Sequence, residues 1–384
     1  MIIQASTTPR RAPQPQVEIA KAGVDDLDRI VEIENASFAL DRLSRRSLRY
    51  LLTRAHADTL VARLDGVIAG YATVLYRSAT SLARLYSIAT DPDWRGHGAG
   101  ARLIEAAEAA AMGRGAVEMR LEVHPKNDRA IGLYRAHGYT HFDDLPDYYE
   151  DHATALRFQK VLHPPDAPRA LGVPYYEQTL DFTCGPAALM MAMSALDPDL
   201  ELDRMLELRL WREATTIFMT TGHGGCGPMG LALAAVHRGF GVEVWIRSPG
   251  TLFVDSVRND DKKEVMRIVQ TDMENELAQA GVPIRYMHIG IGDIRDAIDR
   301  GAMVLLLISS WRLYEERFPH WVVVTGFGDR HVSIHDPYVD YERNRSVSDS
   351  VNLPIPIEEF ARMLRYGRAD QQAAVIIYPS VKEN

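Results

Sequence analysis

Hydrophobic and polar positions in the first half of the chain repeat with the spacings of both helices and strands. Apolar residues recur with helical spacing over Ala101–Met112, which predicts a helix there. Its apolar side consists of Leu103, Ile104, Ala107 and Ala111. The other expected elements are the helices Asp25–Ala36 and Asn127–His137 and the strands Thr59–Arg63, Val67–Tyr76, Leu82–Thr90 and Glu118–Val123.

Turn-forming residues mark the ends of several of these elements. Asp65-Gly66 is typical of a tight hairpin turn between two strands. Asn127 suits the N-cap of the helix that follows it, and Gly138 suits the left-handed position beyond the end of that helix.

The second half of the chain mixes helices and strands in the same way. Its expected helices are Gly185–Leu196, Pro228–Arg238 and the charged stretch Asp260–Ala280. Its expected strands are Val242–Arg247, Met303–Ile308, Ala373–Tyr378 and a hairpin of Trp321–Phe327 with Val332–His335. The predicted fold class is therefore α+β in two domains, each of which mixes helices and strands.

A proline-rich stretch divides the chain. Pro164, Pro165 and Pro168 prevent a regular hydrogen-bonding ladder and stiffen the backbone. The charge balance changes at the same place, because the whole net charge of −9 falls after residue 165. We expect a polar, disordered tail over residues 1–16, a domain over 17–162, a linker over 163–169 and a second domain over 170–384.

Composition narrows the function classes. The chain has only two cysteines, Cys184 and Cys226, which excludes a disulfide framework and a zinc site built on a CxxC pair and is typical of a reducing cytosol. The acidic second half argues against nucleic-acid binding and favours a basic substrate. No apolar run reaches the roughly 18 residues of a membrane helix. We expect a cytoplasmic protein without a metal site or a membrane partner, and composition leaves its oligomeric state open.

A glycine-rich loop lies between a predicted strand and a predicted helix, at Gly96, Gly98 and Gly100. Glycines let the backbone approach a ligand, and a helix start offers free N–H groups, so the loop suits a pyrophosphate. The loop also satisfies the dinucleotide pattern G-x-G-x-x-A, and it could be an ordinary tight turn. A dinucleotide fingerprint belongs to the first strand–helix unit of its domain, whereas a helix and at least three strands precede this loop.

The ordered motifs around the loop resemble the GNAT superfamily of acyl-CoA N-acyltransferases. Arg95 stands directly before the first glycine, the strand Leu121-Glu122-Val123 follows, and a segment from Asn127 to Tyr134 leads to Gly138-Tyr139. The resemblance covers roughly residues 17–160 and is strongest toward the ribosomal-protein N-terminal alanine acetyltransferase branch.

The resemblance implies acetyl-CoA as the co-substrate and gives a role to each matching residue. Backbone groups of Ile88, Ala89 and Thr90 would hold the pantetheine arm. The pyrophosphate would bind to Arg95, Gly96, His97, Gly98, Ala99 and Gly100. Asn127 would orient the cofactor, Tyr134 would protonate the leaving thiolate, and Glu122 would act through water as the general base. From the residues alone, Asn127 could be only a helix cap, Tyr134 a core aromatic and Glu122 part of a solvated face.

Cys184 precedes a run of strong helix formers, with Pro186 suited to the first helical turn. A helix N-terminus stabilises a thiolate and so favours a nucleophile, although a small buried hydrophobe is the commoner fate of a free cysteine.

Residues far along the chain can complete a thiol site. His320 lies 136 positions after Cys184, within the roughly 130–150 that is typical of papain-like enzymes. If residues 328–331 form the turn, the predicted hairpin brings Asp336 to the same end as His320, where a carboxylate could orient the imidazole. Gln178 could donate to an oxyanion.

This set resembles the bacteriocin-processing peptidases, papain-like enzymes that cut after a double-glycine leader, over roughly residues 170–378. The resemblance implies that Gln178, Cys184, His320 and Asp336 are the oxyanion donor, nucleophile, base and orienting carboxylate. The chain departs from the family at Thr183, where many members have Asp, and in the inserts 197–221 and 260–280.

Cys226 follows His223 closely and also precedes a helix. It could be a substrate-loop residue, a redox partner of Cys184 or half of a metal site.

The sequence thus predicts a bifunctional enzyme in which an acetyl-CoA-dependent N-acetyltransferase is fused to a cysteine peptidase. A peptide or protein N-terminus is the expected substrate. The same thiol residues would also serve an amidase, a deamidase or an acyl transferase, and a third interpretation is that one domain is an inert binding module.

Overall fold

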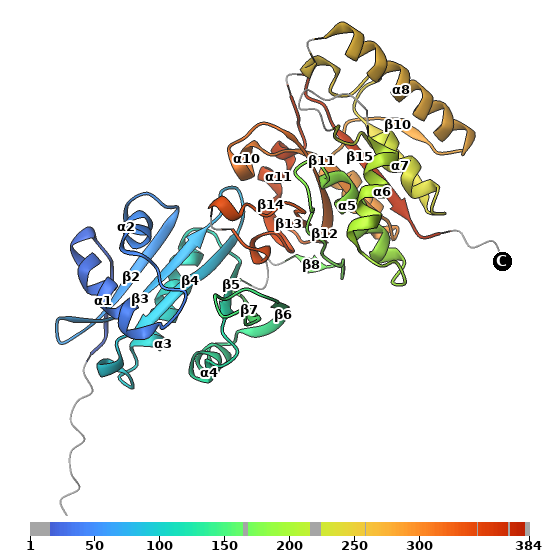
Figure 1. Ribbon diagram of the computed structural model, residues 1–384. Helices are drawn as coiled ribbons and strands as arrows, with labels where there is room; N and C mark the ends of the chain where they lie inside the picture. The colour runs from blue at the N-terminus through green and yellow to red at the C-terminus, as the bar shows by residue number, and fades with distance from the viewer. Residues whose placement is uncertain are drawn as a thin grey trace, which may run out of the picture. The chain divides into compact units, whose positions relative to one another are not determined.

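The computed structural model describes residues 16–163, 168–215, 224–257, 259–343, 345–367 and 369–380. Most of the expected tail and the middle of the expected linker, residues 164–167, lie outside these ranges. The described chain forms two compact units, each with its own sheet (Figure 1). The expected α+β organisation in two domains is confirmed.

The first unit consists of the described residues up to Tyr76 together with Ala83–Leu162. Its sheet has the strand order β1-β2-β3-β4-β5-β7-β6. The strands are β1 Glu18–Lys21, β2 Ala57–Leu64, β3 Val67–Tyr76, β4 Leu82–Thr90, β5 Glu118–Val123, β6 Thr140–Leu145 and β7 Ala155–Val161. The helices are α1 Leu27–Ser37, α2 Arg45–Thr53, α3 Ala99–Gly113 and α4 Asp128–Ala136.

The helices of the first unit bury two separate apolar clusters. Leu103 and Ile104 of α3 and Ile131 of α4 pack with inward-facing residues of β2 and β3. Ile30 and Ile33 of α1 pack instead with residues of α2 and with the alternate positions of the same strands. Because successive strand residues point to opposite faces, both faces of these strands are covered.

The second unit consists of Arg77–Leu82 together with the described residues from His163 onward. Its sheet has the order β10-β9-β15-β11-β12-β13-β14, and β8 pairs with β12. The strands are β8 Arg169–Ala170, β9 Gly241–Ile246, β10 Ile284–Tyr286, β11 Met303–Ser309, β12 Pro319–Phe327, β13 His331–His335, β14 Leu353–Pro356 and β15 Ala373–Tyr378. The helices are α5 Cys184–Leu196, α6 Arg204–Ala214, α7 Pro228–Val236, α8 Asp260–Gln279, α9 Ile291–Asp299, α10 Trp311–Tyr314 and α11 Ile357–Met363.

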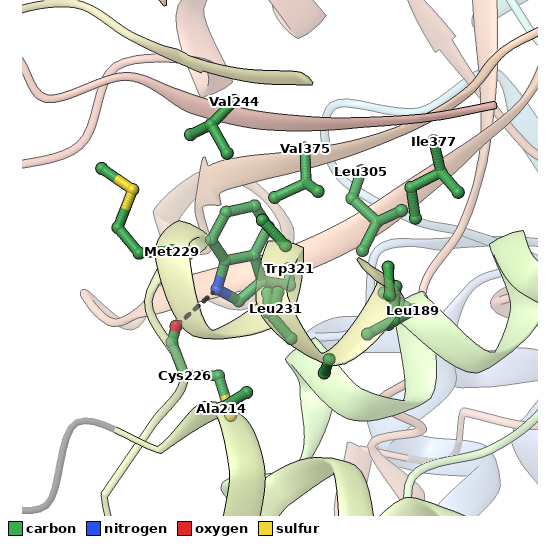
Figure 2. Packing of buried hydrophobic residues seen from close by; sticks show 14 of the residues in the cluster. Leu189, Ala214, Cys226, Met229, Leu231, Val244, Leu305, Trp321, Val375 and Ile377 are labelled. Atoms are coloured by element: carbon green, nitrogen blue, oxygen red, sulfur yellow. Dashed lines mark hydrogen bonds between the residues drawn. The ribbon is translucent and has the colours of Figure 1, made fainter. Parts of the chain in front are cut away.

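The central strands of the second unit are mostly apolar, and both faces of β11 are buried. Leu305 and Leu307 of β11 pack in one cluster with residues of α5 and α7. Val304 and Leu306 of the same strand pack in a second cluster with residues of α9 and α11. Figure 2 shows Leu305 in the first of these clusters with Leu231 and Trp321.

The expected turn residues adopt the predicted conformations. Asp65 and Gly66 have φ angles of 50° and 81°, as a tight hairpin turn requires. Asn127 caps α4, and Gly138 beyond it has a φ of 84°. The sequence analysis did not predict the helices α2, α6, α9, α10 and α11 or the strands β1, β6, β7, β8, β10 and β14, most of which are short.

A glycine at the contact of α6 and α7 provides a test of the packing. A Cβ on Gly230 would lie 2.7 Å from Ala214 Cα, so Gly230→Ala should destabilise the second unit by about 1–3 kcal/mol. The measurement is urea unfolding followed by tryptophan fluorescence, since Trp211, Trp245, Trp311 and Trp321 all lie in this unit.

Gly292 in α9 is the matched control, because nothing lies within 4 Å of a Cβ added there. Gly292→Ala should be neutral or stabilising by up to about 1 kcal/mol. Equal midpoints for the two variants would contradict the described contact of α6 and α7.

Candidate functional site

Cys184 is the first residue of α5, and its thiol is partly exposed. Backbone N–H groups of Gly185 and Trp321 donate to the sulfur. A thiolate at this position is therefore stabilised by the positive end of the helix and by two direct donors.

The hairpin of β12 and β13 brings the other two expected members of the thiol site together. His320 lies near the start of β12, and Asp336 directly follows β13, which pairs antiparallel with β12. Nε2 of His320 lies 2.7 Å from Oδ1 of Asp336, and both residues are buried. The prediction from the hairpin register, that these side chains meet at one end, is confirmed.

The imidazole of His320 also forms a hydrogen bond with the Cys184 thiol. Since Nε2 is held by Asp336, Nδ1 is the ring nitrogen left for the sulfur. The structure thus arranges thiol, imidazole and carboxylate in series, which is the arrangement of a thiol hydrolase.

Electrostatics favour the charged forms of this series. Burial raises the pKa of Cys184. The hydrogen bond and charge of His320 and the two backbone donors lower it by more, so the pKa lies below the usual value. Burial lowers the pKa of His320, but the charge and hydrogen bond of Asp336 and the contact with Cys184 outweigh it and raise the pKa to about 10. Burial also opposes ionisation of Asp336, yet His320 and Arg77 hold its pKa far below the ordinary value.

Gln178 lies beside the series but is engaged elsewhere. Its backbone N–H donates to Pro337 O at 2.9 Å, next to Asp336, and its side-chain Nε2 donates to Leu180 O at 2.9 Å. Its Oε1 is buried and accepts no hydrogen bond within the described residues. A role as oxyanion donor stays a prediction.

A buried carboxylate that the sequence analysis missed supports the loop before Cys184. Glu207 of α6 is fully buried and accepts hydrogen bonds from Tyr176 O–H, Thr179 N–H, Thr179 O–H and Thr183 O–H at 2.5–3.0 Å. Thr183 therefore has a partner in α6, within the insert that the sequence analysis treated as peculiar to this chain.

Two further residues escaped the sequence analysis because they contact Asp336 from outside its hairpin. The hydroxyl of Tyr314 in α10 and the guanidinium of Arg77 both donate to Oδ2 of Asp336. Arg77 lies 259 positions before Asp336, so no local pattern relates them.

Cys226 lies in the core, where it is 6% exposed. Its carbonyl oxygen accepts a hydrogen bond from Trp321 Nε1 at 2.9 Å, drawn in Figure 2. Burial and the charge of Cys184 raise its pKa well above the usual value. His223 lies outside the described residues, and among those described no three His, Cys, Asp or Glu side chains gather as metal ligands.

The first unit presents the glycine-rich loop at the start of α3. Gly96 and Gly98 have φ angles of 87° and 83°, and open space surrounds a Cβ built on either. Gly98 occupies the N-cap without a side-chain cap, so backbone N–H groups of the first turn are free to bind an anion. Gly100 instead packs closely, 3.3 Å from the side chain of Leu133 in α4. These features fit a pyrophosphate-binding loop. Arg95 directly precedes this loop, and His97 lies between its first two glycines.

The pantetheine-binding residues expected from the sequence lie at the end of β4. Ile88 pairs with Ala72, Ala89 with Tyr71 and Thr90 with Gly70 on the β3 side. Only residues 91–95 separate the end of β4 from the first glycine of the loop.

Asn127 and Tyr134 lie at the start and in the middle of α4. Oδ1 of Asn127 accepts a hydrogen bond from Ala130 N–H at 3.2 Å, so the residue does cap the helix. Tyr134 is 5% exposed, and burial raises the pKa of its phenol, which keeps the proton on the oxygen at neutral pH. Its ring contacts that of Tyr139 edge to face.

Glu122 of β5 is buried in an ion pair, and the expected alternative of a solvated face is wrong. Oε2 of Glu122 lies 2.8 Å from Nε of Arg84, whose Nη2 donates to the Tyr148 hydroxyl. The side chain of Glu122 is only 4% exposed. Its role as general base stays a prediction.

The described part of the chain holds no helix long and apolar enough to cross a membrane.

Comparison with known proteins relates the two units to two families. The model of the Peptidase_C39 like family matches residues 173–378, and that of the Acetyltransferase (GNAT) family matches residues 27–139. Acetyl-CoA is the co-substrate of GNAT acetyltransferases.

Similar proteins cover the first unit. The putative ribosomal protein bS18-alanine N-acetyltransferase of Bacillus subtilis (strain 168) is 30% identical over 128 residues, which are 33% of this chain and 83% of that protein. The N-alpha-acetyltransferase RimI of Mycobacterium tuberculosis is 34% identical over 100 residues, 26% of this chain and 61% of that protein.

Solved structures cover the same region. The ribosomal-protein-S18-alanine N-acetyltransferase of Escherichia coli aligns with a TM-score of 0.36 and 24% identity over 38% of this chain and 95% of that one. The NatC complex bound to Gag peptide and CoA aligns with a TM-score of 0.34 and 18% identity over 38% and 98%. The chain belongs to the Peptidase_C39 like family through its second unit, and its first unit is an acetyltransferase domain of the GNAT family.

Proposed function

We propose that the protein is a bifunctional enzyme, an N-acetyltransferase of peptide or protein N-termini joined to a cysteine peptidase. The observation that carries the second half of the proposal is the hydrogen-bonded series of Cys184, His320 and Asp336, of which His320 and Asp336 are buried. A carboxylate, an imidazole and a thiol in hydrogen-bonded sequence have the pairwise contacts that thiol hydrolysis needs.

The thiol reaction follows from the charges of this series. The Cys184 thiolate attacks an amide carbonyl, and His320 gives its proton to the departing amine. Water then cleaves the thioester, releases the acid and restores the thiol. Asp336 holds the imidazole in one orientation and stabilises its positive charge throughout.

In the first unit, the bound co-substrate supplies an acetyl group as a thioester. The loop Arg95–Gly100 and the end of β4 bind it, and Asn127 orients it. The phenol of Tyr134 carries its proton at neutral pH and is the candidate that protonates a leaving thiolate. Glu122 is the candidate that accepts a proton from the incoming amine through water.

The two activities suit a single substrate. A peptidase releases a new N-terminal amine, and an N-acetyltransferase consumes one. Joining both sites in one chain raises the effective concentration of the second site for the product of the first. The net charge of −9 falls in the second half of the sequence, so basic peptides are the first substrates to test, including ones with a double-glycine cleavage site.

The decisive experiment is mass spectrometry of candidate peptides incubated with the full chain, with and without acetyl-CoA. We expect cleavage in both reactions and an acetylated new N-terminus only with acetyl-CoA. Cys184→Ala should abolish cleavage by at least about 10³-fold and leave acetylation of a precleaved peptide intact.

Product masses separate the alternatives. A deamidase would leave the peptide whole with a small mass increase, and an acyl transferase would move the acyl group of the attacked amide to a second amine and release the first amine. Acetylation of only the uncleaved peptide would overturn the coupling of the two activities.

The reactivity of the two cysteines tests the charged state of the thiol site. Because its pKa is lowered, Cys184 should react with iodoacetamide at pH 6–7, whereas Cys226 should be at least about tenfold slower. His320→Ala removes the main group that lowers the pKa and should slow Cys184 by about tenfold or more at pH 7. The sites are quantified by peptide mapping.

Cys226→Ala is the control and should leave the Cys184 rate unchanged. Equal reactivity of both cysteines in the wild type would favour a binding module in place of a thiol hydrolase.

A buried tyrosine tests the acetyl transfer. Tyr134→Phe removes the proposed proton donor and should lower kcat for peptide acetylation by about 10²-fold, with little change in KM for acetyl-CoA. Tyr139→Phe is the matched control, since Tyr139 packs against Tyr134 in the same core. If the two variants lose activity equally, Tyr134 acts only in packing.

A further inference from the structure

The second unit includes a short segment from the first half of the sequence, Arg77–Leu82. Arg77–Leu82 follow β3 in sequence, yet their contacts lie with the second unit. Ser81 N–H donates to Pro354 O in β14 at 2.8 Å, and Ser81 Oγ lies 2.9 Å from His331 Nε2 in β13. Leu82 is 3% exposed and packs in the same cluster as Val322.

Arg77 is the first residue of this segment and is 3% exposed. Its Nη2 donates to Oδ2 of Asp336 at 2.9 Å and to the Tyr314 hydroxyl at 2.7 Å. Its Nη1 donates to the carbonyl oxygen of Asp349, and its guanidinium lies 5.1 Å from the centre of the Tyr314 ring. The positively charged guanidinium is thus held by three partners, Asp336, Tyr314 and the carbonyl oxygen of Asp349.

The two oxygens of Asp336 have separate partners. Oδ1 accepts from His320 Nε2 at 2.7 Å and from Tyr338 N–H at 3.1 Å. Oδ2 accepts from Arg77 and from the Tyr314 hydroxyl. With both oxygens held, the carboxylate plane cannot rotate without breaking a hydrogen bond in the interior.

We infer that Arg77 is a positioning residue of the thiol site: it holds Asp336 ionised and oriented toward His320. Arg77 lies outside residues 173–378, which match the Peptidase_C39 like family, so that region lacks the residue that holds its orienting carboxylate. The inference rests on the proposed thiol chemistry.

Charge balance gives the physical reason. When Cys184 and His320 are ionised, the thiolate, the imidazolium and Asp336 carry a net charge of −1 in the interior, which Arg77 cancels. An uncompensated buried charge is costly, so without Arg77 the series would take up a proton, which the Cys184 thiolate would accept while His320 stays charged. The other titratable and charged groups around the series are Tyr314 of α10, Tyr175, Cys226, Asp349 and Arg345.

The experiment measures the pH dependence of Cys184 alkylation by iodoacetamide in the full-length protein. Arg77→Met should move the acidic limb of this profile up by about one pH unit, which lowers the rate at pH 6 about tenfold. Arg77→Lys restores a positive charge and should return the limb most of the way. Tyr314→Phe removes a neutral donor and keeps Arg77, so it should shift the limb less than Arg77→Met.

Ser81→Ala, in the same segment, is the structural control and should keep the wild-type profile at a similar melting temperature. The inference would be overturned if the pH profile of Cys184 alkylation in Arg77→Met matched that of the wild type. It would also be overturned if Ser81→Ala shifted the profile as much as Arg77→Met. If Arg77→Met does not fold, Arg77→Gln, which also removes the charge, takes its place with the same expected shift and the same outcome that would reject the role of Arg77. An ordinary thiol pKa in the wild type would reject the proposed function itself, and an unchanged Arg77→Met profile beside a reactive wild type rejects only this inference.

Discussion

The negative charge of Asp336 in the interior is the constraint on which the thiol site of the second unit depends. A buried carboxylate is tolerated only with opposite charge and hydrogen-bond donors around it. Here the donors are His320, Tyr314, Arg77 and a backbone N–H, so every available direction on the carboxylate is used. The same charge raises the pKa of His320 and through it favours the thiolate of Cys184.

A second buried carboxylate fixes the other side of the site. Glu207 accepts hydrogen bonds from Thr179 and Thr183 in the loop that leads into α5, and these bonds fix where α5 begins. Cys226 lies behind the helix start, where a Cβ on Gly185 would be 3.2 Å from its Cβ, and its neutral thiol is part of the core. The two cysteines have opposite pKa shifts. The His320 imidazole lowers the pKa of Cys184, whereas burial and the charge of Cys184 raise the pKa of Cys226.

The first unit uses backbone geometry where the second uses charge. The positive φ angles at Gly96 and Gly98 and the uncapped start of α3 expose N–H groups, which suits a phosphate without requiring a buried cation. Glu122 and Arg84 depend on charge instead, since they form a buried ion pair beside Tyr148. The glycine-rich loop is therefore local in sequence, whereas the candidate general base depends on a neighbouring strand.

The sequence by itself determined the features that depend on near neighbours. Apolar spacing located α3 and the central strands, turn residues located the β2–β3 hairpin and the cap of α4, and ordered motifs indicated a GNAT domain and a peptidase-like domain. The meeting of His320 with Asp336 was also predictable, because one hairpin register decides it. Only the tertiary structure decided which groups surround these residues. Glu207, Tyr314 and Arg77 come from separate parts of the chain. Their contacts form, and become buried, only when the sheet and helices pack together. A carboxylate in a sequence carries no sign of its burial, so the sequence could name Asp336 but not the partners that keep it charged.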